Sequence, residues 1–456
     1  MLFSSLEFLY LFLPLSLLLY FLSPKACRNA VLLVVSLLFY AFGEPIYLFL
    51  MLFTIVSDYL FGHLIARSDN PKRWLVFAVI LNLTLLGFFK YYDFLASALS
   101  LPTLGLALPI GISFYTFQAL SYVIDVYRRE VSAQKSLVAF GTYVTLFPLV
   151  IAGPFVRYCD VDLQLKERSY PPSRVARGIA AFSAGLAKKV LFANPAGELA
   201  EGLLGGEITL LGGWLYLVLY AFQIYFDFSG YSDMAVGLGR VLGFDFPENF
   251  RYPYVSRSIT DFWRRWHITL SSWFREYVYI PLGGNRRGRW RTYRNLLITW
   301  ALTGIWHGAA WNFLLWGLYF FFLLAMEKAF LGKVLERVPR ALRHLYSLFF
   351  ILLGWMIFSS DSVSLSEGLA RAAALFGVGC DGLVGVAGYE LIRSLPLLAL
   401  MAVGATPLPK RVYLWLIQKY PRGGRYVRNA LCVAAWLLCT AYLVDSGYNP
   451  FLYFRF

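Results

Sequence analysis

The sequence predicts an all-α, polytopic membrane protein, and three features of the chain support this fold class. Of its 456 residues, 59% are hydrophobic and only 15% are charged, whereas a soluble domain usually carries about 25% charged residues. Aromatic residues make up 18% of the chain. Apolar stretches that are long enough to cross a bilayer as helices recur along nearly the whole length. We therefore expect one membrane domain over 1–456, without a separate soluble domain.

The expected transmembrane or re-entrant helices number about 11–13. In chain order, the apolar stretches are 7–23, 29–42, 46–66, 74–90, 104–124, 136–155, 176–193, 209–228, 295–308, 309–327, 341–358, 386–404 and 429–445. Several are too short or too rich in glycine to face lipid alone, so we expect broken helices around a central cavity. The first stretch has no basic region before it, which indicates a retained span and not a cleaved signal.

The orientation in the membrane follows from the basic residues, which concentrate in cytoplasmic loops. They follow the first, third and fifth stretches and precede the last one: Lys25, Arg28, Arg67, Lys72, Arg73, Arg128, Arg129, Arg422, Arg425 and Arg428. This pattern predicts that both the N-terminus and the C-terminus are extracytoplasmic.

The least membrane-like region is 247–295, which we expect to be a cytoplasmic amphipathic segment. Within 251–295 there are ten Arg and no Lys against two acidic residues, a net charge of +8. Guanidinium groups suit phosphate and carboxylate, so the segment could bind an anionic acyl donor. Contact with lipid head groups explains the charge equally well. The overall charge of +15 is typical of cytoplasmic loops, and nucleic acid is not an expected partner.

His307 is the strongest candidate for chemistry among the four histidines. It lies inside an apolar stretch, where an ionisable side chain is costly and usually functional. Gly304 and Gly308 have the spacing that allows close helix contact, and Thr303 and Trp311 are each four residues away, on the same face of a helix. A neutral imidazole there can take a proton from a hydroxyl group. The alternative is a structural histidine bonded across helices.

His267 lies in a tryptophan-rich segment, 258–273. Ser258 and Asp261 have capping-box spacing, which predicts a helix starting at Ile259. The apolar side chains then form one stripe of an amphipathic helix at the membrane surface, namely Trp263, Trp266, Leu270 and Trp273. His267 borders the stripe and could face the protein interior, or it could be an interfacial residue without a role. His63 and His344 receive no role.

Two carboxylates, Asp227 and Asp233, close the apolar stretch that ends near 228, with Ser229 between them. They could orient an imidazole or pair with an arginine, or they could mark the membrane boundary. The five cysteines are scattered without a C-x-x-C pair, which favours apolar filler over a metal or redox site. We expect no metal and no tightly bound cofactor.

The C-terminal tail, 446–456, is almost wholly aromatic or apolar, unlike an ordinary frayed chain end. It could be an interfacial anchor. Alternatively, it folds back into the cavity and presents the hydroxyl of Tyr453, which could accept an acyl group when a histidine removes its proton.

Together these motifs resemble the membrane-bound O-acyltransferase superfamily, in particular its bacterial alginate O-acetyltransferase-like branch. The resemblance covers most of the chain and is carried by 2–5, 113–118, 148–154, 227–233, 260–273, 279–285, 304–308 and the aromatic terminus. It implies that His307 is the catalytic histidine and that His267 is a second active-site histidine. The motif residues that we expect near the substrate are Trp306, Thr303, Gly304, Asp227, Ser229, Asp233, Trp263, Trp266, Ser271, Trp273 and Asn285.

The resemblance also implies an activity. A ring of helices would surround a pocket or funnel in the bacterial inner membrane. Acetyl from a cytoplasmic thioester, acetyl-CoA or another, would be passed across for O-acetylation of an exported polysaccharide such as alginate, with an extracytoplasmic esterase-like partner. The related D-alanyl transferases of teichoic acid have a small partner with a similar aromatic C-terminus, which favours the Tyr453 hypothesis.

Three other functions stay open from the sequence. The first is transfer of D-alanyl or another acyl group to a cell-envelope polymer. The second is a transporter that uses His307 as a proton relay. The third is a structural scaffold for an export complex.

Overall fold

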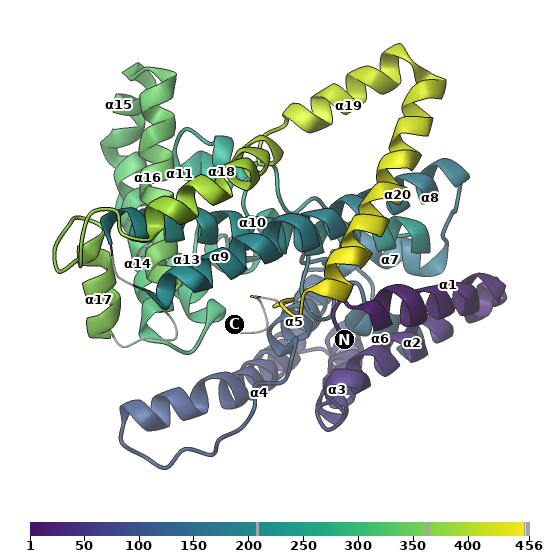
Figure 1. The fold of residues 1–456 in the computed structure, drawn as a ribbon. Helices are drawn as coiled ribbons and strands as arrows, with labels where there is room; N and C mark the ends of the chain where they lie inside the picture. The colour runs from purple at the N-terminus through teal and green to yellow at the C-terminus, as the bar shows by residue number, and fades with distance from the viewer. Residues whose placement is uncertain (207–208, 361–364, 451, 453–456) are drawn as a thin grey trace. The chain divides into compact units, whose positions relative to one another are not determined.

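The computed structural model describes residues 1–206, 209–360, 365–450 and Leu452. Over these residues the secondary structure is helical, and the only β-type pairing is an isolated bridge between Thr209 and Gly382 (Figure 1). The expected all-α fold is confirmed.

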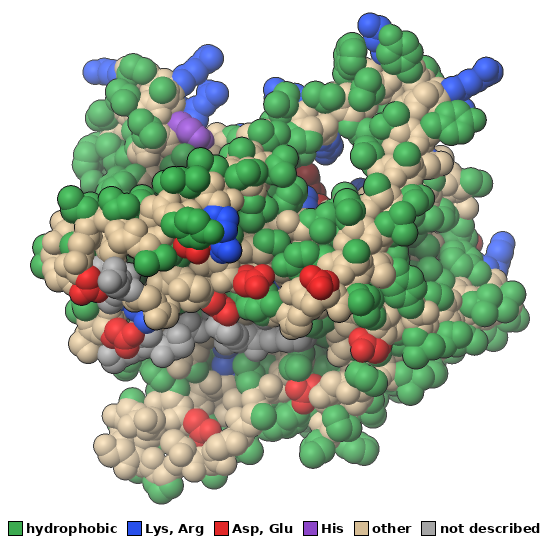
Figure 2. Space-filling view, viewed as in Figure 1, with side chains coloured by type: hydrophobic (Ala, Val, Ile, Leu, Met, Phe, Trp, Pro, Cys, Tyr) green, Lys and Arg blue, Asp and Glu red, His purple; other side chains and the backbone are tan. Residues whose placement is uncertain are grey.

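The described part of the chain contains eight helices that are long and apolar enough to cross a membrane. They are Lys25–Gly43, Leu48–Arg67, Pro71–Ala98, Leu210–Leu242, Trp311–Arg337, Arg340–Phe358, Ala387–Gly404 and Pro421–Asp445. Hydrophobic side chains cover much of the face in view (Figure 2), as contact with lipid tails requires. The protein is therefore a multi-pass membrane protein, while the closed ring of helices stays a prediction.

The chain divides into two compact units, the first made of Met1–Ser183 with Tyr231–Glu248, and the second of Ala184–Gly230 with Asn249–Phe456. The main helices of unit 1 are α1 (Leu13–Leu22), α2 (Arg28–Gly43), α3 (Leu48–Arg67), α4 (Pro71–Ala98), α5 (Ile112–Tyr127), α6 (Leu137–Thr145) and α7 (Tyr158–Lys166). Two further helices, α8 (Pro172–Ala187) and α10 (Leu210–Leu242), run from one unit into the other.

Unit 2 contains the site described below. Its helices are α9 (Asn194–Leu204), α11 (Ile259–Trp263), α12 (Ile268–Phe274), α13 (Arg289–His307), α14 (Trp311–Met326), α15 (Gly332–Arg337), α16 (Arg340–Phe358), α17 (Leu365–Ala374), α18 (Ala387–Gly404), α19 (Leu408–Lys419) and α20 (Pro421–Asp445). Wider π-helical turns join several of them at Lys188–Ala193, Arg275–Tyr279 and Glu327–Leu331.

Several expected spans have different limits in the structure, and two of them show why. The stretch 136–155 forms only α6, after which 146–156 is buried but irregular, because Pro148 cannot continue a helix. The stretch expected to end near 228 continues as α10 to Leu242. Asp227 therefore lies inside a helix and not at the end of one. At Gly230 this helix packs closely on the end of α8, since a Cβ there would lie 2.7 Å from the carbonyl oxygen of Gly185.

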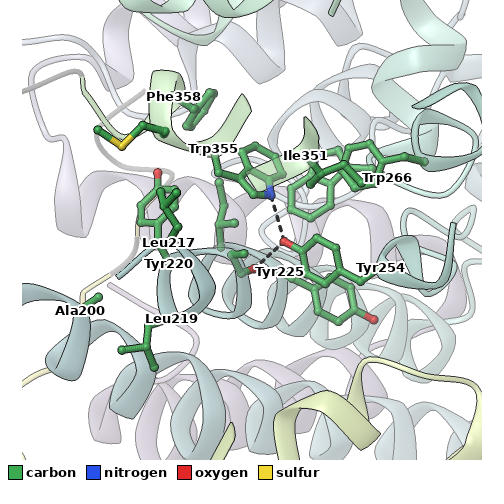
Figure 3. Close-up of a cluster of buried hydrophobic side chains, with 14 of the residues drawn as sticks. Ala200, Leu217, Leu219, Tyr220, Tyr225, Tyr254, Trp266, Ile351, Trp355 and Phe358 are labelled. Atoms are coloured by element: carbon green, nitrogen blue, oxygen red, sulfur yellow. Dashed lines mark hydrogen bonds between the residues drawn. The ribbon is translucent and has the colours of Figure 1, made fainter. Parts of the chain in front are cut away.

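A cluster of buried hydrophobic side chains, many of them aromatic, forms the core of unit 2 (Figure 3). Tyr254 belongs to this cluster and donates a hydrogen bond to the carbonyl oxygen of Ala221 at 2.6 Å. It accepts another from Trp355 Nε1 at 3.1 Å. Because buried polar groups are costly without partners, these bonds hold the start of the Arg-rich segment to α10 and α16.

Candidate functional site

His267 lies at a break between two short helices. The predicted helix start is confirmed, since α11 begins at Ile259 and Ser258 Oγ accepts from the backbone N–H of Asp261 at 3.0 Å. The helix then stops at Trp263, and His267 has a left-handed φ of 43°. The prediction of one continuous amphipathic helix over 259–273 is therefore wrong.

The physical reason for the break is competition for backbone hydrogen bonds. The N–H of Arg251 donates to the carbonyl oxygen of Arg265 at 2.9 Å. The N–H of Ile268 donates to the carbonyl oxygen of Asn249, also at 2.9 Å. These bonds to residues 249–251 replace helical ones. The turn buries His267 to 1% exposure, so the expectation that it can face the interior is confirmed.

Asn249 fixes the orientation of the His267 ring. Asn249 Oδ1 accepts from the backbone N–H of Thr269 at 3.3 Å and from its hydroxyl at 2.8 Å, and lies 3.0 Å from His267 Nδ1. An oxygen that accepts from a backbone N–H also accepts from the ring, so Nδ1 carries the proton. Burial, and to a lesser degree the neighbouring His307, lowers the pKa of His267 well below its usual range. His267 is thus a neutral imidazole with its lone pair on Nε2.

His307 is the last residue of α13, and Gly308 is already extended. Trp311 starts α14 and is 58% exposed, so the prediction that it shares a helix face with His307 is wrong. The prediction of close helix contact at Gly304 is confirmed, because a Cβ there would lie 3.2 Å from the Cα of Gly317 in α14.

Aromatic rings enclose the His307 imidazole on several sides. Ring centroids lie 5.0 Å away for Trp306, 5.0 Å for Trp316 and 5.3 Å for Phe358, all nearly edge-on. Only 4% of His307 is exposed. Trp306 also packs against His267 at 6.4 Å. One indole therefore contacts both imidazoles.

His267 and His307 line the same cavity, which has a volume of about 250 Å³. We call it the histidine cavity. Its wall is mostly apolar and comes from α11 to α14 and the π-helical turn after α12. The residues that line it are Thr260, Trp263, Arg264, Trp266, His267, Leu270, Ser271, Phe274, Arg275, Tyr279, Leu296, Thr299, Trp300, Thr303, His307 and Leu324. Arg264 and Arg275 are exposed, so positive charge lies at its rim.

The predicted substrate-pocket residues thus fall into two groups. Trp263, Trp266, Ser271 and Thr303 line the histidine cavity. The others lie outside its wall: Trp306 beside both histidines, Gly304 against α14, Trp273 buried near Tyr277, Asn285 in an exposed turn, and Asp227, Ser229 and Asp233 on α10.

Asp227 contacts neither an imidazole nor an arginine among the hydrogen bonds and ion pairs of the described residues. Its Oδ1 lies 2.7 Å from Lys189 Nζ, and its Oδ2 accepts from the backbone N–H of Leu452 at 3.0 Å. The described part of the tail is therefore bound to α10, whereas Tyr453 lies outside the described residues.

Sequence reasoning missed two residues of this region. Nothing in the sequence connects Asn249 with His267, because the contact depends on the turn between α11 and α12. Lys189 did carry a signal, since it is a charged residue inside the apolar stretch 176–193, and such residues are usually functional.

Comparison with known proteins identifies the family of this chain. The model of the membrane-bound O-acyltransferase family matches residues 128–367, which include both histidines. A probable alginate O-acetylase of Azotobacter vinelandii is 42% identical over 83% of this chain and 79% of its own length. One of Pseudomonas putida is 37% identical over 100% of both chains. A peptidoglycan O-acetyltransferase of Helicobacter pylori is 35% identical over 80% of this chain and 78% of its own length. The chain therefore belongs to the membrane-bound O-acyltransferase family and is an O-acetyltransferase.

Proposed function

We propose that this enzyme takes acetyl from a cytoplasmic thioester, with acetyl-CoA as the candidate donor, and passes it outward for O-acetylation of an exported polysaccharide such as alginate. The observation that carries the proposal is the histidine cavity, in which two buried imidazoles share one apolar space. The apolar wall suits an acetyl thioester. The exposed guanidinium groups of Arg264 and Arg275 at the rim suit the phosphates of CoA.

In this mechanism His307 acts as the general base. It takes the proton of the acceptor hydroxyl as that oxygen attacks the thioester carbonyl. The carbon–sulfur bond then breaks, and the proton passes from His307 to the departing thiolate, which leaves an ester and a free thiol. His267, held neutral by burial, assists by accepting a hydrogen bond at Nε2 and orienting the reacting groups.

The first acceptor in this proposal is the hydroxyl of Tyr453. An aryl ester stays activated because a phenol is a good leaving group, with a pKa of about 10. The support lies in the neighbouring residue Leu452, which is buried and belongs to the same hydrophobic core cluster as Trp316 and Phe358, two of the rings around His307. An extracytoplasmic esterase-like partner would then move the acetyl group to the glycan. Relatives that are named for alginate and peptidoglycan support a polysaccharide as the final acceptor.

The test of the function is the O-acetyl content of the exported glycan in a strain that carries His307→Ala. We expect acetylation to fall to the level of the deletion strain while polymer is still made and the protein stays in the membrane. His63→Gln is the matched control, because His63 packs on Tyr59 in unit 1 and lies outside the cavity wall. Unchanged acetylation in His307→Ala would remove the catalytic assignment.

Tyr453→Phe tests the proposed acyl acceptor separately, because it removes only the hydroxyl oxygen. Loss of glycan acetylation with normal protein level is the expected result. Normal acetylation would leave the tail as an anchor and would send the acetyl group directly to an external acceptor.

A further inference from the structure

A buried ion pair holds the described end of the chain. Lys189 lies in the π-helical turn Lys188–Ala193 and Asp227 lies in α10, and their charged atoms are 2.7 Å apart. The side chains are only 4% and 2% exposed. A buried ion pair loses much of its hydration, and its attraction compensates only when further hydrogen bonds satisfy both groups.

The further hydrogen bonds go to the C-terminal segment. Lys189 Nζ donates to the carbonyl oxygen of Pro450, and Asp227 Oδ2 accepts from the backbone N–H of Leu452 at 3.0 Å. Beside them, Asn194 Nδ2 donates to Asn449 Oδ1 at 3.2 Å.

Each charge of the pair faces a backbone group of the complementary kind. The cation faces a carbonyl oxygen, and the carboxylate faces an N–H group. Both bonds are to the backbone, so they recognise the position of the chain and not its side chains at 450 and 452. A slip of the tail by one residue would move both backbone groups away from their charges. The pair therefore fixes the register of the tail as well as its place.

The same helix, α10, also reaches His267. The residue after Asp227 is Phe228, whose ring packs edge-on against His267 with centroids 4.6 Å apart. Leu452 is 7% exposed and belongs to the cluster that includes Trp263 and Trp266, which line the cavity. A third contact packs the tail closely, since a Cβ on Gly197 would lie 2.8 Å from the hydroxyl of Tyr448.

We propose that Lys189 and Asp227 are positioning residues that form a clamp on the tail backbone at Pro450 and Leu452, and that this clamp sets the register in which the tail takes part in acetyl transfer. The inference rests on the proposed function, because the tail matters for activity only if it takes part in acetyl transfer. It assigns to Lys189 and Asp227 a role that a structural ion pair between two helices would not have.

The main test is the double variant Lys189→Met with Asp227→Leu. Replacing a buried ion pair by apolar side chains usually keeps a protein folded, but it leaves the tail without its two charge-assisted bonds. The purified full-length protein in detergent is treated with carboxypeptidase Y, and the remaining mass is measured. We expect the wild type to keep Leu452 and every residue before it, and we expect digestion of the variant to continue inward past Leu452. Glycan acetylation should fall by about tenfold or more, since each lost bond to a charged group is worth that much.

A charge exchange, Lys189→Asp with Asp227→Lys, separates the clamp from a structural pair. It keeps one cation beside one anion but places each against the wrong backbone group, so we expect the same loss. The matched control is Arg371→Glu with Glu367→Arg, which exchanges a pair at 2.7 Å whose side chains are 24% and 50% exposed. That control should keep both tail protection and acetylation.

The outcomes divide clearly. Wild-type tail protection or wild-type acetylation in both clamp variants would overturn the clamp, even if His307→Ala abolishes acetylation. Acetylation that survives in His307→Ala would instead overturn the proposed function. Tail release together with loss of acetylation, in either clamp variant that is present in the membrane at wild-type level, supports the clamp.

Discussion

At the scale of single residues, one side-chain oxygen decides the chemistry of His267. Asn249 Oδ1 accepts three hydrogen bonds, from Thr269 twice and from the His267 ring. Because this fixes the proton on Nδ1, the lone pair of the ring is at Nε2. The same logic orients catalytic imidazoles in enzymes whose histidines are held by a third group.

We therefore expect Asn249→Ala to lower glycan acetylation by about tenfold, because a lost bond of 1–3 kcal/mol lets the ring change its tautomer or turn. Glycan acetylation measured across pH shows whether the effect acts through the imidazole, since a shifted pH profile would not follow from a packing defect. Asn429→Ala is the control, as Asn429 is exposed and bonds only to Arg428 among the described residues. A wild-type rate and pH profile in Asn249→Ala would contradict this role.

His267 also makes the stability of the fold depend on pH. Its pKa is lowered by burial, so between that lowered value and about 6.5 the unfolded chain binds a proton that the folded chain does not. Stability then rises with pH through this window and is lost as the pH falls. We expect the unfolding temperature in detergent to drop between pH 7.5 and pH 5.5, and to drop less in His267→Gln. An equal drop in both proteins would show that other groups dominate.

At the scale of helices, the close contact between α13 and α14 places His307. A Cβ on Gly317 would lie 3.2 Å from the Cα of Gly304 and would clash with the carbonyl oxygen of Trp300. Gly317→Ala should therefore push the helices apart, lower stability by about 1–3 kcal/mol, and reduce acetylation because His307 lies one turn beyond Gly304.

Gly87→Ala is the matched control for that substitution, since Gly87 lies inside α4 with no atom near its Cβ position. There the change should leave stability unchanged or raise it by about 0.4–1 kcal/mol. The measurement is the thermal unfolding temperature of the two purified variants, which should fall only in Gly317→Ala. If Gly317→Ala is as stable and active as Gly87→Ala, the contact does not position His307.

At the scale of helices, some features of the structure could be predicted from the sequence and others could not. Hydropathy predicted most spans, and an ionisable residue in an apolar stretch pointed to His307, because both signals are local. The break before His267 was not predictable, since the stripe of Trp263, Trp266 and Leu270 fits a helix and only the bonds to residues 249–251 interrupt it. The π-helical turns that carry Lys189 and Arg275 were also not predicted. One extra residue in a helical turn does not change the amino-acid composition or the hydropathy of the segment.

At the scale of the whole molecule, charge sets the orientation in the membrane. Lys and Arg side chains of unit 2 gather over α15 and over the turn between α19 and α20 (Figure 2). Helix α15 comes just before the span α16, and the turn comes just before the span α20. Both lie at the same end of unit 2 in the view of Figure 1. Basic residues are retained on the cytoplasmic side, which supports the orientation proposed from the sequence.

Cysteine labelling tests that orientation, because the five cysteines form no disulfide and can be replaced. In the cysteine-free protein, Thr103→Cys probes the exposed loop between α4 and α5, and Arg286→Cys probes the exposed turn before α13. We expect a membrane-impermeant maleimide to label position 103 in intact spheroplasts, and position 286 only after the membrane is opened, because the Arg-rich segment must face the cytoplasmic donor. The cysteine-free parent is the labelling control. Labelling of position 286 from outside would put the rim of the histidine cavity on the wrong side for a cytoplasmic thioester, and the donor would then have to be sought outside the cell.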